Sequence, residues 1–219
     1  MTTTTISTKV RVFEIIAVIL TALGKFVFMD YLNWRLLFIA TAILFWSGYV
    51  LYRSKKNVGI KKYWGFRTDN FKKVMLMLLP FGLISIVAFI GIGFYQKTIN
   101  ITWHIIPVLI LYPIWGIIQQ YLLIALTAGN LRDLKNKPFN KGTIIFLSAT
   151  LFGLIHYPFA WLIIGTFILA LLYGTVYLKE KNIYVLGIFH GWLGGLFFYT
   201  VVDRDPFIET FGRLLHITK

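Results

Sequence analysis

The chain has 219 residues, of which 58% are hydrophobic and 14% charged; it has no cysteine, and its formal net charge is +14. A water-soluble domain of this length could not hide so much apolar surface, whereas lipid can act as its solvent, so the composition excludes an ordinary soluble protein. The basic residues cluster between apolar runs, which is typical of the cytoplasmic loops of a membrane protein and argues against nucleic acid as a partner. The lack of cysteine excludes disulfides and thiolate metal sites.

Seven apolar runs follow a polar stretch, residues 1–11, which we expect to be a disordered tail. Most runs are close to the ~20 residues that a helix needs to cross ~30 Å of hydrocarbon. The run at 143–157 is shorter and ends just before Pro158. The predicted spans are 12–29, 36–52, 74–95, 104–128, 143–157, 159–178 and 183–201. The expected fold class is therefore an all-α, polytopic transmembrane helix bundle with about seven spans.

The two ends of the chain carry their own expectations. Lys9 and Arg11 precede the first run, as in a signal peptide, but we find no small-x-small cleavage pattern and expect a retained span. Glu14 and Lys25 share this span and are too far apart to meet within it, so we expect them to snorkel toward opposite interfaces. The C-terminal tail, 205–219, is too short and too polar to span, and we expect it at an interface.

The distribution of Lys and Arg predicts the orientation. With the N-terminus inside, sixteen Lys and Arg residues fall in cytoplasmic segments and five on the opposite side, in accord with the positive-inside rule. The loop 53–73 holds eight of the sixteen and interleaves them with aromatic residues, so it either lies along the anionic inner leaflet or is solvated. We expect an integral protein of the bacterial cytoplasmic membrane, with membrane lipid as a partner.

Polar side chains interrupt three of the apolar runs: the pair Gln119-Gln120, then His156, then His190. Polar groups inside a membrane usually face a bundle interior and serve a site, so one group per span indicates a site assembled from several helices. Each group also has a structural interpretation. The glutamines can join helices by hydrogen bonds, His156 can reach water at a helix end, and His190 can pack among glycines.

The spacing around these residues resembles a known family. Residues 115–124 read WGIIQQYLLI, 149–158 read ATLFGLIHYP and 187–195 read GIFHGWLGG. In order and spacing the three stretches are similar to the CPBP intramembrane protease family, which includes type II CAAX prenyl endopeptidases and bacteriocin self-immunity proteins. That family carries Glu-Glu-x-x-x-Arg, Phe-x-x-x-His and His-x-x-x-Asn on successive core helices. The resemblance covers about 100–200 and implies a CPBP-like core at 100–204, preceded by N-terminal spans at 12–99.

The match to the motifs is incomplete. Gln119 and Gln120 stand where the family has its glutamates, Ile124 replaces the arginine, and Gly194 replaces the asparagine. Because the two acidic charges and the arginine are lost together, the change is electrostatically self-consistent. The residues that the chain keeps are Phe152, His156 and His190. We predict Gln119, Gln120, His156 and His190 as the catalytic positions, and Phe152 and Gly194 as binding positions.

The resemblance implies an intramembrane endopeptidase that acts on membrane or prenylated peptides, with a glutamate that activates water. A carboxamide cannot accept a proton from water near neutral pH, so two alternatives remain beside this one. The first is a catalytically silent relative that binds a membrane peptide or protein; the second is a carrier of small molecules or lipids. We expect no cofactor, because two histidines and neutral amide oxygens would hold a divalent metal only weakly.

Overall fold

The computed structural model of the chain describes residues 6–135 and 139–217. Helices, three of them π-helical segments labelled η, account for the regular structure of this part of the chain. In order they are α1 (Thr8–Lys25), η1 (Phe26–Tyr31), α2 (Arg35–Lys56), α3 (Ile60–Trp64), α4 (Phe71–Gln96), α5 (Ile105–Gln120), η2 (Tyr121–Gly129), α6 (Asn130–Arg132), α7 (Lys141–Ile155), α8 (Ala160–Glu180), α9 (Ile183–Phe197), η3 (Phe198–Val202) and α10 (Pro206–Leu215).

Six helical stretches are long and apolar enough to cross a membrane, and α7 is a shorter apolar helix. The six are Thr8–Tyr31, Arg35–Lys56, Phe71–Gln96, Ile105–Arg132, Ala160–Glu180 and Ile183–Val202. Together with α7 they correspond one to one to the seven predicted spans, and every boundary agrees to within four residues. The prediction of a transmembrane helix bundle is confirmed.

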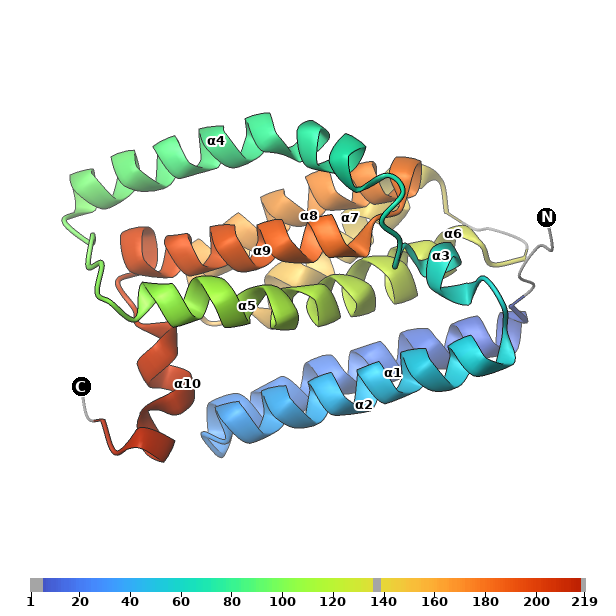
Figure 1. Cartoon of the computed structure of the whole chain (residues 1–219), viewed down its shortest axis with the longest axis horizontal. Helices are drawn as coiled ribbons and strands as arrows, with labels where there is room; N and C mark the ends of the chain where they lie inside the picture. The colour runs from blue at the N-terminus through green and yellow to red at the C-terminus, as the bar shows by residue number, and fades with distance from the viewer. Residues whose placement is uncertain (1–5, 136–138, 218–219) are drawn as a thin grey trace.

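The long helices run roughly parallel along the molecule, with α5 and α9 side by side (Figure 1). The α1–α2 hairpin flanks α5, and α4 lies on the other side of α9 (Figure 1). The short helix α10 runs across the bundle at one end (Figure 1). We call this end the α10 end, and the opposite end, where α3 and the N-terminus lie, the N-terminal end.

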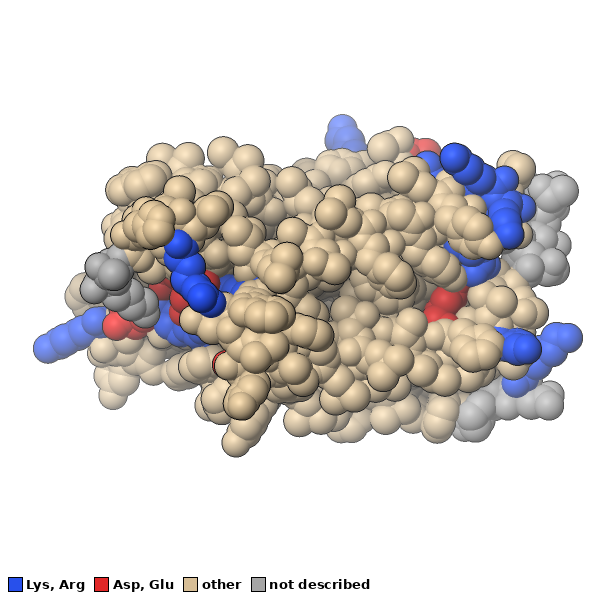
Figure 2. Space-filling model, turned by 90° about the horizontal axis from the view of Figure 1, so that it is seen from below, with Lys and Arg blue, Asp and Glu red and all other residues tan. Residues whose placement is uncertain are grey.

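Charged residues and apolar surface lie in different parts of the molecule along the line that joins its two ends. Seen from the side of α1 and α2, Lys, Arg, Asp and Glu gather mainly at the two ends, and most of the surface between them carries no charge (Figure 2). Large apolar side chains lie open on the helices, among them Leu44 at 74% exposed and Val87 at 71%. Such a belt is stable when lipid covers it. The protein is therefore an integral membrane protein.

The prediction of a disordered tail at residues 1–11 is wrong for residues 8–11, which are helical. Helix α1 already begins at Thr8, where the Ser7 hydroxyl accepts a hydrogen bond from the backbone N–H of Val10 at 3.4 Å and caps the helix. Arg11 is 6% exposed and hydrogen-bonded within the bundle, which holds this first turn in place. Residues 1–5 of the predicted tail lie outside the described residues.

The segment predicted as a loop at 53–73 is partly folded onto the bundle, and its position relative to the leaflet stays a prediction. It contains α3, whose Ile60 and Trp64 side chains are fully buried against the bundle. Gly65, with a φ of 93°, then turns the chain so that its carbonyl accepts a hydrogen bond from the backbone N–H of Ile183 at 2.9 Å. The apolar side chains of this segment therefore pack against the bundle at the N-terminal end, because removing apolar surface from water is favourable.

Helix α5 changes its winding directly after Gln119 and Gln120. From Tyr121 to Gly129 the chain is π-helical, and the Thr127 hydroxyl donates to the carbonyl oxygen of Leu122, five residues earlier, at 3.1 Å. Single π-helical turns inside α-helices are frequent at functional sites, because they shift the faces on which later side chains lie.

Candidate functional site

A cavity of about 410 Å³ lies among helices α1, α2, α4, α5, α7, α8 and α9. Its wall is largely apolar, and Gln119, Phe152, His156, His190 and Gly194 all belong to the lining. Three stretches that are far apart in the sequence therefore meet around one space. The catalytic or binding roles assigned to these residues stay predictions, but the geometry allows them to act together.

Gln119 and His190 form a direct hydrogen-bonded pair across two helices. The His190 Nε2 atom lies 2.9 Å from the Gln119 Oε1 atom. The helices come this close because α9 presents glycines to α5: a Cβ on Gly187 would lie 2.4 Å from the Cα of Ile117, and one on Gly191 would lie 2.4 Å from a backbone nitrogen of α5. Small residues that let two membrane helices touch backbone to backbone thus set the position of this pair.

His156 occupies the position just after the last residue of α7. Its ring Nδ1 lies 2.8 Å from the carbonyl oxygen of Phe152 and 3.3 Å from the hydroxyl oxygen of Thr166. That hydroxyl donates to the carbonyl oxygen of Leu162 at 2.6 Å, so it can accept from the imidazole. The Phe152 ring contacts both imidazoles, with centroid distances of 5.0 Å to His156 and 5.3 Å to His190.

These contacts determine which nitrogen of each neutral imidazole carries the proton. A carbonyl oxygen can only accept, so His156 donates from Nδ1 to Phe152 and keeps the lone pair on Nε2. By the same argument His190 donates from Nε2 to Gln119 and keeps the lone pair on Nδ1. The His190 Nδ1 atom is buried and has no partner within the described part of the chain. His156 therefore keeps an unprotonated Nε2 on a half-buried ring, whereas the unprotonated Nδ1 of His190 is enclosed by protein.

Gln120 faces away from the cavity. Its side chain is fully buried, and it does not belong to the lining, because successive residues of an α-helix point about 100° apart. Neither its amide nitrogen nor its amide oxygen has a hydrogen-bond partner in the described residues. Ile124, at the family's arginine position, is also fully buried and outside the lining. A role for Gln120 at the site stays a prediction that this geometry does not favour.

Gly194 leaves open space on the cavity wall. An added Cβ at this position would have no heavy atom within 4 Å. The family's asparagine would project into that space, so its replacement by glycine enlarges the cavity and removes one amide from it. The position therefore allows more room for a ligand and offers one hydrogen-bond partner fewer.

The donor set does not fit a catalytic metal. Catalytic zinc sites use three protein ligands drawn from His, Cys and carboxylates. Across residues 6–135 and 139–217, no three His, Asp or Glu side chains gather as such a site requires. His156 and His190 could supply two ligands, but the Gln119 oxygen already accepts a hydrogen bond from His190.

The structure also reveals a buried polar centre that we did not predict. Glu14 is 4% exposed, and its carboxylate accepts hydrogen bonds from Arg53 at 2.9 Å, from Asn130 at 2.7 Å and from Tyr49. The expectation that Glu14 snorkels to an interface is wrong, because donors from two other helices compensate the burial of its charge. Lys25 does reach the opposite end of the molecule, but it is ion-paired there with Asp30 at 2.6 Å and lines the cavity.

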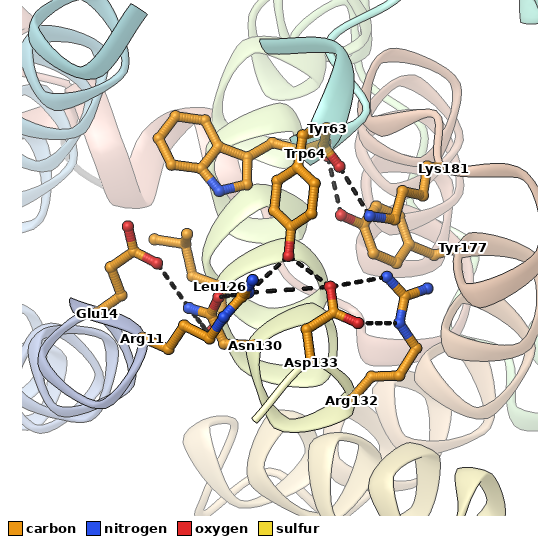
Figure 3. Close-up of polar contacts among 10 residues, drawn as sticks. All are labelled: Arg11, Glu14, Tyr63, Trp64, Leu126, Asn130, Arg132, Asp133, Tyr177 and Lys181. Carbon is orange, nitrogen blue, oxygen red and sulfur yellow. Dashed lines mark hydrogen bonds and ion pairs between the residues drawn. The ribbon is translucent and has the colours of Figure 1, made fainter. Parts of the chain in front are cut away.

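A network continues from this centre across the N-terminal end (Figure 3). Arg11 donates to Asn130 at 3.1 Å and to the Tyr63 hydroxyl, and that hydroxyl donates to Asp133. Arg132 holds the same carboxylate with two hydrogen bonds, at 2.7 and 3.0 Å. None of these side chains lines the cavity, so the network joins α1, α3 and α6 behind the site.

Two pKa values in the network are displaced. Burial opposes ionisation of Asp133, but hydrogen bonds from Arg132 and Tyr63 outweigh it and lower the pKa of this carboxyl to about 2. Burial lowers the pKa of Lys181 to about 8. The Lys181 ammonium donates to the carbonyl oxygen of Tyr63 at 2.9 Å and lies 3.9 Å from the centre of the Tyr63 ring. Asp133 is thus firmly ionised, whereas Lys181 titrates just above neutral pH.

Comparison with known proteins identifies the family. A family model described as type II CAAX prenyl endopeptidase Rce1-like matches residues 17–195. The match begins well before residue 100 and takes in α2, α4 and the second half of α1, which carry none of the recognised motifs. Searches of curated proteins and of solved structures find no match. The chain belongs to the Rce1-like family of type II CAAX prenyl endopeptidases, as the resemblance to CPBP proteases predicted.

Proposed function

We propose that this protein is a catalytically silent member of its family that binds an apolar or prenylated membrane peptide in the cavity. The observation that carries this proposal is the identity of the group at position 119. The side chain that faces the cavity there is a carboxamide, and its oxygen is already bonded to His190 at 2.9 Å.

A carboxamide cannot act as a general base. Base catalysis contributes about 10²–10⁴-fold to a rate, so its loss leaves slow hydrolysis at most. Asp30 provides the one carboxylate within the described lining, and it is engaged by Lys25 at the α10 end. Hydrolysis by a carboxylate that activates water therefore has little support from these residues.

The same residues are well suited to binding. An apolar wall accepts an apolar chain, and a few convergent polar groups fix the orientation of a ligand in such a pocket. The free nitrogen of His156 can accept a hydrogen bond from a peptide N–H group, while the Gln119 amide nitrogen can donate to a peptide carbonyl. A peptide held this way satisfies its polar backbone without being cleaved.

A second function is favoured by one specific observation. Each neutral imidazole keeps one unprotonated nitrogen, so a histidine could take over the activation of water and make the protein an endopeptidase. In that case His156 is the better candidate, because it is only partly buried and its Nδ1–H is held by Phe152.

We further propose that the N-terminal end faces the cytoplasm of a bacterium. Most Lys and Arg residues lie at this end, in accord with the positive-inside rule. Cysteine accessibility to an impermeant thiol reagent in intact cells tests the proposal: a cysteine at Asn57 should be protected and one at Lys97 labelled. The reverse pattern would show the opposite orientation.

Binding and cleavage can be measured together on protein in liposomes with a fluorescent prenylated peptide. We expect saturable binding and an intact peptide. Gly194→Phe should weaken binding at least tenfold, because the new ring enters the cavity, whereas Gly48→Phe should not. Gly48 is the matched control, since its added Cβ also meets nothing within 4 Å but lies on the exposed face of α2. Equal binding by both variants would place the ligand elsewhere.

Cleavage decides between the two functions. If the wild-type protein cuts the peptide and both His156→Ala and His190→Ala abolish cleavage, the protein is an enzyme and the proposal that it is catalytically silent is wrong. Cleavage that is equal in both alanine variants would come from a contaminating protease and would leave binding as the activity of the chain.

A further inference from the structure

We propose that the α10 end of the cavity contains an anion-binding subsite formed by Arg35 and Arg204. The cavity would then select ligands that combine one apolar chain with a terminal carboxylate or phosphate. This inference rests on the proposal that the cavity binds a ligand, and it specifies the chemistry of that ligand.

Arg35 and Arg204 have the same carboxylate as their ion-pair partner. Arg204 binds the Glu209 carboxylate through Nε at 2.5 Å and through a terminal nitrogen at 2.8 Å, and Arg35 approaches the same carboxylate at 3.4 Å. The nearby pair of Lys25 and Asp30 is neutral as a unit. Two guanidinium groups therefore share one carboxylate, so this ion-pair cluster has one positive charge more than negative. The neighbouring Asp205 does not pair with either arginine, because His104 and the Tyr199 hydroxyl engage its carboxylate.

Arg35 has a guanidinium nitrogen without a partner, and Arg204 lies against an aromatic ring. The Arg35 Nε atom is buried and has no hydrogen-bond partner in the described residues. The Arg204 guanidinium carbon lies 3.9 Å from the centre of the Phe159 ring, which shields that cation from water. Their side chains are only 19% and 18% exposed, and both belong to the cavity lining. An arginine in such surroundings binds carboxylate or phosphate with paired, charge-assisted hydrogen bonds.

The position of the charges gives the ligand a direction. The charged groups in the described lining, which are Lys25, Asp30, Arg35 and Arg204, all lie at the α10 end. Away from them the wall is built from Val18, Leu122, Leu123, Leu169 and other apolar side chains. An amphiphile therefore fits with its chain among the apolar helices and its anionic group at the arginines.

The volume sets the length of the chain. A protein cavity of about 150 Å³ accommodates benzene, which has six carbon atoms. On that scale the 410 Å³ of this cavity correspond to a chain of roughly sixteen carbons. Single-chain carboxylates and single-chain phosphates of this length share the required chemistry.

The test compares anionic and neutral ligands of the same chain on the whole protein in detergent. Hexadecanoate is paired with hexadecanol, and farnesyl phosphate with farnesol; the two pairs distinguish a carboxylate source from a phosphate source. We expect at least one anion to bind ten times or more tightly than its alcohol, with a preference that shrinks as salt is added. Equal affinity within both pairs would overturn the anion subsite.

Matched variants separate charge from structural damage. Arg35→Gln and Glu209→Gln both break the same ion pair, but they change the net charge of the subsite in opposite directions. We expect Arg35→Gln to weaken anion binding about tenfold or more and Glu209→Gln to strengthen it, with alcohol binding unchanged in both. Weaker anion binding in both variants would refute the inference, because it would show that the ion pair matters only for the fold.

The outcomes also distinguish this inference from the proposed function. Alcohols and prenylated peptide that bind without preference for the anion would leave the cavity as a ligand site and remove only the subsite. Anions that bind while prenylated peptide does not would retain the subsite and contradict the peptide-binding function.

Discussion

Replacing Gln119 by glutamate should convert the site from a binding site into a hydrolytic one. The new carboxylate would take the place of the amide oxygen, 2.9 Å from the His190 Nε2 atom, and would face the cavity. It would then be a general base hydrogen-bonded to an imidazole, in a cavity that can hold a peptide. Base catalysis is worth about 10²–10⁴-fold, so we expect a gain of at least about 10²-fold in the cleavage rate.

The energetic cost of this change is moderate. An acidic side chain at the centre of a membrane helix costs about 2.5–3.5 kcal/mol on insertion scales. A hydrogen bond to a charged group returns about 1.5–3 kcal/mol, and His190 is in position to donate it. The net loss of stability should therefore stay below about 2 kcal/mol, which a folded bundle tolerates.

Gln120→Glu is the matched control for this variant. It introduces the same chemical group one residue later, where the side chain is fully buried, faces no cavity and has no hydrogen-bond donor among the described residues. An uncompensated buried charge of this kind costs about 3–5 kcal/mol. We therefore expect Gln120→Glu to unfold at a lower temperature than Gln119→Glu and to gain no activity.

The assay is the release of product from a quenched fluorescent prenylated peptide by each variant in liposomes. A wild-type rate that already equals that of Gln119→Glu would refute the reasoning, because the amide would then not limit catalysis. Activity gained by Gln120→Glu and not by Gln119→Glu would show that the two side chains face the opposite way from the structure.

Three further predictions concern the fold. Gly187→Ala should lower the thermal midpoint and the stability by about 1–3 kcal/mol, because its methyl group would lie 2.4 Å from a backbone atom of α5. Gly48→Ala is the control: its methyl group meets no atom within 4 Å, so it should be neutral or stabilising by up to about 1 kcal/mol. Glu14→Gln should destabilise the protein by about 3–5 kcal/mol in denaturant titrations, since it leaves the buried Arg53 without its counter-ion; an unchanged midpoint would show that this ion pair is dispensable. The pKa of Lys181 is about 8 in the folded state and near 10.5 in the unfolded state, so the unfolded chain binds more protons between these pH values. The free energy of unfolding therefore rises with pH through this window, and Lys181→Met should remove that rise. Identical pH dependence of the unfolding midpoint in the wild type and in Lys181→Met would contradict this prediction.

The spans could be predicted from the sequence because hydropathy reports a local requirement. Each helix must be apolar over the thickness of the bilayer, so the boundaries found from the apolar runs agree with the structure. The convergence of Gln119, His156 and His190 also followed from local information, because polar residues in apolar helices need a polar neighbourhood. The pairing of Gln119 with His190 was not predictable, since it depends on how α5 and α9 are rotated.

Features that depend on tertiary contacts were missed. The expectation for Glu14 failed because Arg53 and Asn130, its partners, come from other helices, and no pattern within the first span points to them. The two adjacent glutamines were treated as one unit, although helix geometry alone places them on different faces. The burial of Trp64 was missed because charges surround it in the sequence, and only the docked α3 shows which side chains point inward.

Native mass spectrometry of the wild-type protein, incubated with a prenylated peptide in lipid nanodiscs, reports binding and cleavage in one spectrum and so decides whether the protein holds the peptide intact. We expect a one-to-one complex whose mass equals the sum of the protein and the intact peptide, and which is lost in Gly194→Phe. A spectrum with shortened peptide, from protein whose His156→Ala and His190→Ala variants leave the peptide intact, would contradict this expectation and identify a working endopeptidase.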